Sequence, residues 1–332
     1  MNNLKNRYEI VFFVQAKNCN PNGDPDMGNL PRIDFDTNKA YMTDVSIKRK
    51  IRDYVLEKFD GAYGNDIFVR NGVNLNKAIA ECNMKANDGK IEKGKNSSNA
   101  RKYACEKFYD IRAFGGVLST GANAGQIQGP VQFDMPVSID KATDNEITIS
   151  RMAYTEELPK AKTLEDYDNF DATLDDNKKR TFGKKTFVPF ALFECHAFVS
   201  ATLANQTGFS EEDLNTLLEA ICNMYEFRKS ASKNGMGIIG PVIVFKHIGT
   251  QHNNNSDQNE KEAILGCAPA QKLFKLIKVE KKDDIEFPRN YEDYNVTINL
   301  SKLPNGVTVG FKENPFDEIS WGHTDNEWIE EL

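Results

Sequence analysis

The alternation of apolar and polar positions divides the chain into strands and helices. Residues 8–17 (YEIVFFVQAK) are almost continuously apolar and rich in β-prone side chains, which predicts a strand buried on both faces at the centre of a sheet. Residues 43–59 place Ile47 and Ile51 at helical spacing behind Thr43, which is suited to the N-cap, and this pattern predicts a helix. The cations of that helix fall off its apolar stripe, so we expect them to face outward near its N-terminus.

Further strands and a second helix complete the predicted sheet. The sequence SEED at 210–213 caps a helix that extends to about Arg228. The order strand, helix, strand, strand, helix, strand, with large insertions, favours an α+β fold of a modified ferredoxin-like type. The remaining predicted strands are 130–139, 146–154, 186–203, 241–247, 272–279, and a hairpin of 294–300 with 306–311 around Pro304-Asn-Gly306.

Two polar segments interrupt this order. Residues 60–110 are rich in Asn, Lys and Gly and contain only short helical stretches, so they indicate a helical insertion with a flexible loop. Residues 140–185 begin and end next to predicted strands, which indicates an excursion that leaves the sheet and rejoins it. Both segments are expected to project from the main body.

Composition limits the class of protein. The 332 residues, 39% of them hydrophobic, suffice for a substantial core. No run approaches the roughly 18 to 20 apolar residues of a membrane span, and the first residues lack the apolar core of a secretory signal, so we expect a cytoplasmic protein without membrane contact. The six cysteines form no CxxC pair and no Cys/His cluster, which favours reduced thiols and argues against a metal site.

Charge is distributed unevenly along the chain. Residues 280–332 carry five Lys or Arg against thirteen Asp or Glu, a net of −8, whereas the whole chain has a net charge of −7. The acidity that would argue against a nucleic-acid partner therefore lies mostly in the tail. Cation runs are usually solvated faces, but three together favour a nucleic-acid backbone as partner. The runs are Lys48/Arg49/Lys50/Arg52, Lys178/Lys179/Arg180/Lys184/Lys185 and Arg228/Lys229/Lys233.

The loop between the first strand and the first helix, residues 18–26 (NCNPNGDPD), supports two interpretations. In one interpretation, its Asn and Asp side chains form hydrogen bonds with their own backbone in turns. In the other, Asn20 and Asn22 donate hydrogen bonds to phosphate and sugar oxygens. Asp24 and Asp26 could hold Mg²⁺ for phosphodiester cleavage. Against cleavage, Asp-Pro-Asp is a turn signal and no catalytic His, Glu or Lys stands near it in sequence.

Motifs in order along residues 7 to 280 resemble the backbone subunit of the type I-C Cascade, the CRISPR surveillance complex. They are Asn20-Pro-Asn-Gly-Asp-Pro-Asp26, Leu30-Pro-Arg-Ile-Asp34, Thr43-Asp-Val-Ser-Ile-Lys-Arg-Lys-Ile-Arg52, Asp110-Ile-Arg-Ala-Phe-Gly115, Gln128-Gly-Pro-Val-Gln-Phe-Asp-Met-Pro136, Phe187-Val-Pro-Phe190, Gly208-Phe-Ser-Glu-Glu-Asp213 and Val244-Phe-Lys-His247. The resemblance implies an RRM-like palm, a helical fingers insertion and a β-hairpin thumb. The implied boundaries are 1–59 (palm), 60–110 (fingers), 111–139 (palm), 140–185 (thumb), 186–280 (palm) and 281–332 (C-terminal hairpin and acidic tail).

The resemblance also implies a function. Copies of such a non-catalytic subunit stack head to tail along one CRISPR guide RNA, each thumb kinks the guide, and the bases between thumbs stay open for target DNA. A guide-processing end subunit, a large subunit and a small subunit are its other partners, and no cofactor is expected. Because a repeated subunit must read backbone and leave sequence to base pairing, we expect low guide-sequence specificity.

Candidate RNA contacts combine cations, amides and possible apolar wedges. Met152 or Phe182 could wedge beside a base at a kink, or could simply pack within the thumb. Two other functions remain open: a metal-dependent ribonuclease that uses Asp24 or Asp26, and a protein-interaction scaffold, which the acidic total charge favours. The candidate contacts are Asn20, Asn22, Arg32, Lys48, Arg49, Arg52, Arg112, Gln128, Arg151, Met152, Phe182, Lys184, Lys185 and Arg228.

Overall fold

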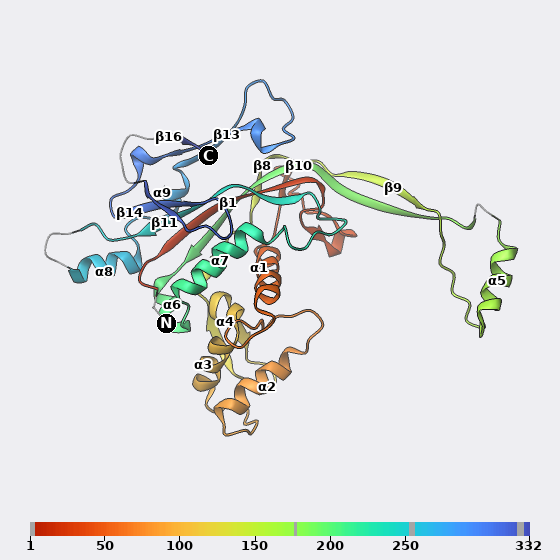
Figure 1. The fold of residues 1–332 in the computed structure, drawn as a ribbon, viewed down its shortest axis with the longest axis horizontal. Helices are drawn as coiled ribbons and strands as arrows, with labels where there is room; N and C mark the ends of the chain where they lie inside the picture. The colour runs from red at the N-terminus through yellow and green to blue at the C-terminus, as the bar shows by residue number, and fades with distance from the viewer. Residues whose placement is uncertain (1–3, 176–177, 252–255, 324–328) are drawn as a thin grey trace.

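The computed structural model describes residues 4–175, 178–251, 256–323 and 329–332, and Figure 1 shows their arrangement. The helices are α1 (Asp44–Phe59), α2 (Leu75–Ala86), α3 (Ser97–Lys107), α4 (Tyr109–Phe114), α5 (Leu164–Thr173), α6 (Ala201–Thr207), α7 (Glu211–Asn223), α8 (Ser256–Leu265) and α9 (Ala270–Phe274). No helix in the described part of the chain is long and apolar enough to cross a bilayer.

The strands form one large antiparallel sheet and several small ones. They are β1 (Tyr8–Cys19), β2 (Gly23–Asp24), β3 (Leu30–Pro31), β4 (Lys39–Tyr41), β5 (Gly115–Leu118), β6 (Gly125–Gln128), β7 (Val131–Phe133), β8 (Val137–Lys141), β9 (Asn145–Arg151), β10 (Thr181–Val199), β11 (Met236–His247), β12 (Ile277–Lys281), β13 (Tyr294–Asn299), β14 (Val307–Lys312), β15 (Ser320–His323) and β16 (Ile329–Glu331). The large sheet has the order β15-β14-β11-β1-β10-β8-β4, and β7 also pairs with β10. The predicted mixed fold of helices and strands is confirmed, and its large sheet is antiparallel.

Strand β1 lies at the centre of this sheet and is buried on both faces. It pairs antiparallel with β10 on one side and with β11 on the other. Alternate side chains such as Phe12 pack into the core beneath α1 and α7, whereas Val11 and Phe13 pack against the C-terminal sheet β12-β13-β16. The unbroken apolar run of residues 8–17 thus correctly predicted a central strand, because both of its faces need apolar cover.

The predicted C-terminal hairpin of 294–300 with 306–311 is wrong. Strand β13 pairs with β12 and β16, whereas β14 pairs with β11 and β15 in the large sheet. The turn around Pro304 therefore joins two sheets instead of two paired strands. In this arrangement β14 supplies hydrogen-bond partners to the edge of β11, which a hairpin would have left unpaired.

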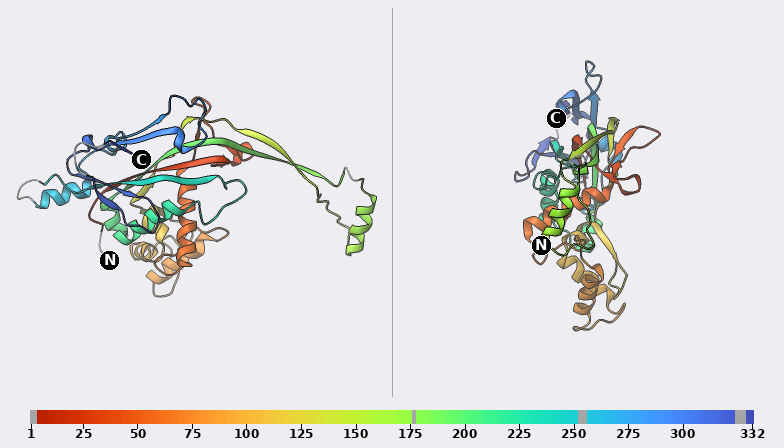
Figure 2. Two further views of the ribbon diagram at one scale, coloured as in Figure 1. Left: turned by 45° about the horizontal axis from the view of Figure 1, so that its top comes forward. Right: turned by 90° about the vertical axis from the view of Figure 1, so that its right-hand side faces the viewer.

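Two parts project from the body. Helices α2 and α3 form a helical lobe, whose small core also includes Ile111, Leu118, Ala122 and Ala124 (Figure 1). Strand β9 and the first half of β10 form a two-stranded arm that carries α5 at its far end (Figure 2). Every residue of β9 is exposed, and α5 buries no side chain. A two-stranded ribbon of this kind gains little stability from burial.

Candidate nucleic-acid interface

Most cations of α1 are engaged within the chain, which corrects the prediction that they face outward. The Nζ of Lys48 lies 3.0 Å from Asp44 Oδ2 and 3.0 Å from Gln132 Oε1, and the residue is only 9% exposed. Arg49 donates to Asp53 Oδ1 at 2.7 Å and to the carbonyl of Val69 at 2.7 Å. Asp44 and Asp53 are i,i+4 neighbours on α1, but the helical pattern could not show the acceptors Gln132 and Val69, which the fold brings from other segments.

Arg52 forms the most buried of these α1 contacts. Its Nε donates to Asp110 Oδ2 at 2.7 Å, and its guanidinium lies 5.2 Å from the ring centroid of Phe114. Asp110 is fully buried and also accepts from the backbone amides of Phe68 and Val69. The Arg52–Asp110 pair therefore ties α1 to the helical lobe.

The loop after β1 is held largely by its own side chains. Asn22 Oδ1 accepts from the amide and the hydroxyl of Thr43 at 2.9 and 3.0 Å, so Asn22 fixes the start of α1, and the hydroxyl of Thr43 does not cap the helix. Asn20 is buried and donates to the carbonyl of Asn29. Arg32 pairs with Asp24 at 3.0 Å. Turn chemistry, one of the two interpretations of this loop, accounts for these contacts.

The carboxylate of Asp24 has partners for both oxygens. Oδ2 contacts Arg32, and Oδ1 accepts from the amide of Asp26 at 3.1 Å, where it caps a short 3₁₀ helix. No group of three or more His, Cys, Asp or Glu side chains that could hold a metal ion occurs among the described residues.

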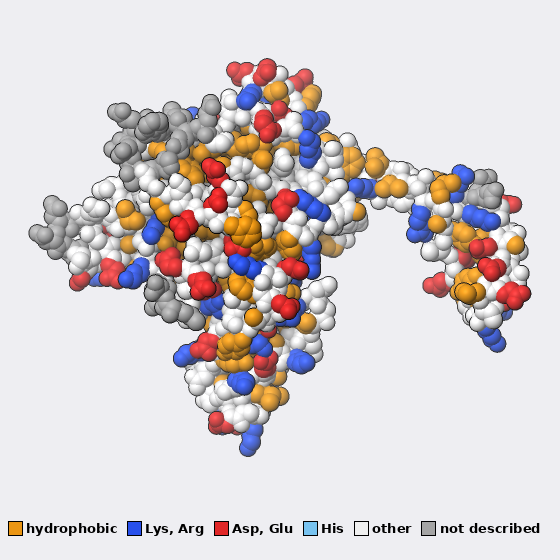
Figure 3. Space-filling view, in the orientation of Figure 1, with side chains coloured by type: hydrophobic (Ala, Val, Ile, Leu, Met, Phe, Trp, Pro, Cys, Tyr) orange, Lys and Arg blue, Asp and Glu red, His pale blue; other side chains and the backbone are white. Residues whose placement is uncertain are grey.

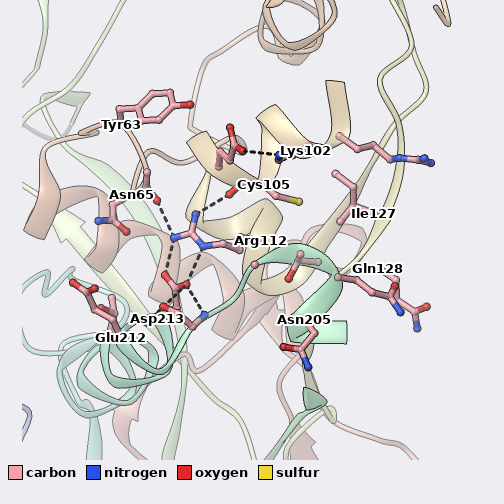
Figure 4. A pocket seen from close by; sticks show the side chains of 18 of the residues that line it. Tyr63, Asn65, Lys102, Cys105, Arg112, Ile127, Gln128, Asn205, Glu212 and Asp213 are labelled. Atoms are coloured by element: carbon pink, nitrogen blue, oxygen red, sulfur yellow. Dashed lines mark hydrogen bonds and ion pairs between the residues drawn. The ribbon is translucent and has the colours of Figure 1, made fainter. Parts of the chain in front are cut away.

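Arg112 and Gln128 line a cavity of about 1130 Å³ between α3, β6, α6 and the start of α7 (Figure 4). The guanidinium of Arg112 is buried, donates to both carboxylate oxygens of Asp213 at 2.6 and 3.0 Å, and also contacts the carbonyls of Gly64 and Cys105. Gln128 is exposed at the far side of the cavity. Arg112 thus joins α4 to α7, and its charge is neutralised inside the chain.

The pairing register of the arm divides its side chains between two faces. Phe182 lies opposite Ser150 and Lys184 opposite Thr148, so both project from one face. Arg151 and Lys185 lie on the other face, together with exposed Ile147 and Ile149. Phe182 is 73% exposed, and Met152, just after β9, is 70% exposed. Both possible wedges are thus exposed, and neither is buried as packing within the arm.

Cations from two basic runs, Lys185 and Lys233, lie near the last residue of β1, Cys19, and a cation of the third run acts on Lys233. Burial raises the pKa of the Cys19 thiol, and the positive charges of Lys233 and Lys185 oppose that rise. Lys233 in turn faces Lys50 of α1, whose charge reinforces the effect of burial and lowers the pKa of Lys233 to about 8. Figure 3 shows Lys and Arg side chains along the edge of the body that faces the arm, and on the arm itself.

Two of these cations, Lys50 and Lys233, were not among the predicted contacts. Both lie in recognised basic runs, but nothing in the sequence shows that Lys50 lies near Lys233. The signal that could have selected Lys233 is its Gly-rich loop (KSASKNGMG), since such loops bring backbone and cations close to phosphate. Arg228, which was predicted, lies at the same edge, exposed and 3.6 Å from Glu57.

Comparison with known proteins gives a consistent family match. The family model described as "CRISPR-associated protein Cas7" matches residues 6–299. A curated protein of the same description from Haloferax volcanii is 30% identical over 161 residues, which are 42% of this chain and 45% of that protein. The match therefore spans less than half of the curated relative.

Two chains in solved structures are also similar. One belongs to a "CRISPR RNA-guided surveillance complex, pre-nicking", with a TM-score of 0.43 over 73% of this chain and 78% of that one. The other belongs to a "CRISPR RNA-guided surveillance complex", with a TM-score of 0.42 over 81% and 80%. Both are 13% identical in sequence.

Proposed function

Because the chain belongs to the Cas7 family of CRISPR-associated proteins, we propose that it is the RNA-binding backbone subunit of a type I-C surveillance complex. Copies of the chain bind head to tail along one CRISPR guide RNA in the cytoplasm, and the guide bases stay open for target DNA. The guide-processing end subunit, the large subunit and the small subunit are its further partners. The subunit cuts no phosphodiester bond and uses no cofactor.

One observation carries this proposal: members of three basic runs that are far apart in sequence lie near the end of β1. Lys233 donates to the carbonyls of Asn20 and Pro21, Lys185 stands three residues before Val188, which pairs with Cys19, and the charge of Lys50 acts on Lys233. None of the three has an ion-pair partner in the described part of the chain, although the protein as a whole is acidic. Unpaired cations gathered on an acidic protein favour a polyanionic partner.

The architecture supports the assignment of palm, fingers and thumb. The strand order β11-β1-β10-β8, with α1 after β1 and α7 before β11, is that of a ferredoxin-like or RRM-like palm. The helical lobe at 60–110 corresponds to the fingers, and the arm within 140–185 corresponds to a thumb that folds over the guide. Residues 1–59, 111–139 and 186–280 then make up the palm. Of the C-terminal segment, β13 covers the second face of the palm, whereas β14 and β15 extend its sheet.

The candidate residues divide into two groups under this proposal. One group positions the interface, because its side chains already form hydrogen bonds or ion pairs within the chain: Asn20, Asn22, Arg32, Lys48, Arg49, Arg52 and Arg112. The other group is exposed or half-buried and contacts RNA directly: Gln128, Arg151, Met152, Phe182, Lys184, Lys185 and Arg228.

Co-expression of the chain with a CRISPR array tests the function directly. We expect purified protein to carry RNA, to form multimers on it, and to leave it uncut in Mg²⁺. Material with the ultraviolet absorbance ratio of bare protein would contradict RNA binding and favour a protein scaffold. Mg²⁺-dependent RNA loss that disappears in Asp24→Ala, with binding retained, would instead establish a ribonuclease.

A further inference from the structure

The amine of Lys233 is fixed at the end of β1 in an unusual way. Its Nζ donates to the carbonyl of Pro21 at 2.6 Å and to the carbonyl of Asn20 at 3.2 Å. An ammonium group has three donors, so one N–H of Lys233 is left for another acceptor. No carboxylate contacts this amine among the described residues.

Lys50 of α1 is a second cation near this amine, close enough for its charge to act on Lys233. It forms no hydrogen bond or ion pair with any described residue. Burial lowers the pKa of Lys50, and the charges of Arg228 and Arg49 act in the same direction. Asp53 opposes this effect, but its carboxylate is already bound by Arg49.

Two half-buried cations that repel each other without a carboxylate between them are unfavourable in the free protein. An anion placed between them would satisfy both amines and remove the repulsion. We propose that Lys50 and Lys233 form a site for a single phosphate group, which on the proposed function is one backbone phosphate of single-stranded RNA in each subunit.

The position of the site suits this ligand. The carbonyls of Asn20 and Pro21 belong to the loop that follows β1, and they hold the Lys233 amine in a fixed position. Lys185, at the root of the arm, faces Cys19 beside the same amine, so a strand bound along the arm would continue past the pair. Guide backbone could thus run from the arm onto the body over this site.

The site also predicts a proton linkage. Lys233 has a pKa of about 8 in the free protein, and a bound phosphate favours its charged form. Below pH 8 the amine is already charged, so affinity is constant; as the pH rises through 8, binding must take up a proton and weakens. Cys19, the other titratable group that faces this amine, has a raised pKa and stays a neutral thiol in that range.

The test is the binding of a fluorescent single-stranded RNA to the full-length protein and to K50Q and K233Q, as a function of salt and pH. We expect each substitution to lower the slope of log affinity against log salt by about 0.7, the value of one phosphate contact on a single strand. We expect wild-type affinity to fall above pH 8, at most about tenfold per pH unit for one proton. In K233Q, RNA affinity should no longer fall above pH 8, because the titrating amine is absent. In K50Q, the fall should occur at higher pH, because Lys50 no longer repels the charged amine of Lys233.

Matched controls remove the same charge from paired lysines nearby. Lys58 lies on α1 and pairs with Glu219, and Lys229 lies in the Lys233 loop and pairs with Glu226. K58Q and K229Q should keep the wild-type pH profile. If wild type binds RNA but K50Q matches K58Q in both salt slope and pH profile, the phosphate site is wrong and the proposed function still stands. If wild type binds no RNA, the proposed function itself fails.

Discussion

Helix α1 carries four cations within five positions, and they divide into two kinds. Lys48, Arg49 and Arg52 each contact a carboxylate, whereas Lys50 contacts none among the described residues and faces the amine of Lys233. The difference does not arise from helix periodicity alone. It depends on where the fold places Asp110, and on the loop that brings a second cation to Lys50.

The comparison shows that the cations of one basic run do not all have the same role. Arg49 and Arg52 hold the helical lobe against α1, and Lys48 joins α1 to β7 through Gln132, so the charges of all three are neutralised within the chain. Lys50 has no such partner and keeps its charge for an external anion. Carboxylates decide which of the two roles a cation has: Asp44 and Asp53 lie one helical turn from their partners on α1, whereas the fold brings Asp110 to Arg52.

The largest effect is expected at the buried partner of Arg52. Asp110→Asn should lower the free energy of unfolding by about 3–5 kcal/mol, because it leaves the guanidinium of Arg52 without its buried counter-charge. Urea unfolding followed by circular dichroism measures this loss. Asp53→Asn, which removes the more exposed partner of Arg49, is the control and should cost less than about 1 kcal/mol. Equal losses in the two variants would show that burial does not distinguish these pairs.

Comparison of K48Q with K50Q tests the division most directly. K50Q should weaken RNA binding by about 1.5–3 kcal/mol, the range for a hydrogen bond to a charged group, while leaving the unfolding free energy nearly unchanged. K48Q should do the reverse, since its amine binds Asp44 and Gln132. Fluorescence anisotropy at fixed salt and urea unfolding of the same samples measure both quantities. If K48Q and K50Q both fold and lose the same RNA affinity, the distinction between paired and unpaired cations is wrong.

How far sequence could anticipate these features depends on the range of the interaction. The apolar run of residues 8–17 identified a central strand, because a strand that is buried on both faces needs apolar side chains at nearly every position. The helical lobe and the arm followed from local composition. The partner of Arg112 is Asp213, 101 residues away, and no local pattern indicates such a contact.

The same reason explains two of the errors. The residues of β13 and β14 have the pattern of a hairpin, but the partner of a strand depends on which sheet edges are free once the whole chain has folded. The outward direction of Lys48 failed because Gln132 of β7 and Asp44 give its amine internal acceptors. In each case the sequence pattern identified the strand or helix, but contacts between distant segments determined what it binds.

On the arm, a similar comparison can be made between two exposed apolar side chains on opposite faces. Phe182→Ala should weaken RNA binding by about 1–3 kcal/mol, the range for loss of a base stacked on an aromatic ring. Because Phe182 is exposed, its removal should change the unfolding free energy by no more than about 0.5 kcal/mol. Binding of a short single-stranded RNA and urea unfolding measure the two effects.

Ile147→Ala on the opposite face of the arm is the matched control. Ile147 is also exposed, but it lies on the opposite face, which carries the cations Lys185 and Arg151. Because Ile147 has no ring to stack on a base, its removal should cost less RNA affinity than the removal of Phe182. A loss of affinity in Ile147→Ala as large as in Phe182→Ala would mean that the two faces of the arm do not differ in what they bind.

The smallest effect is expected at Asp24, where the loop carboxylate has partners within the chain. Asp24→Ala removes a 3₁₀-helix cap and the pair with Arg32, and should lower the unfolding free energy by about 1 kcal/mol. RNA affinity should stay within about twofold of wild type, because the cations beside Cys19 are unchanged. The comparison on α1 predicts this result: a charge with partners inside the chain contributes to stability. If Asp24→Ala instead leaves stability unchanged and abolishes RNA binding, a paired charge has an external role, and pairing no longer separates the two kinds of residue.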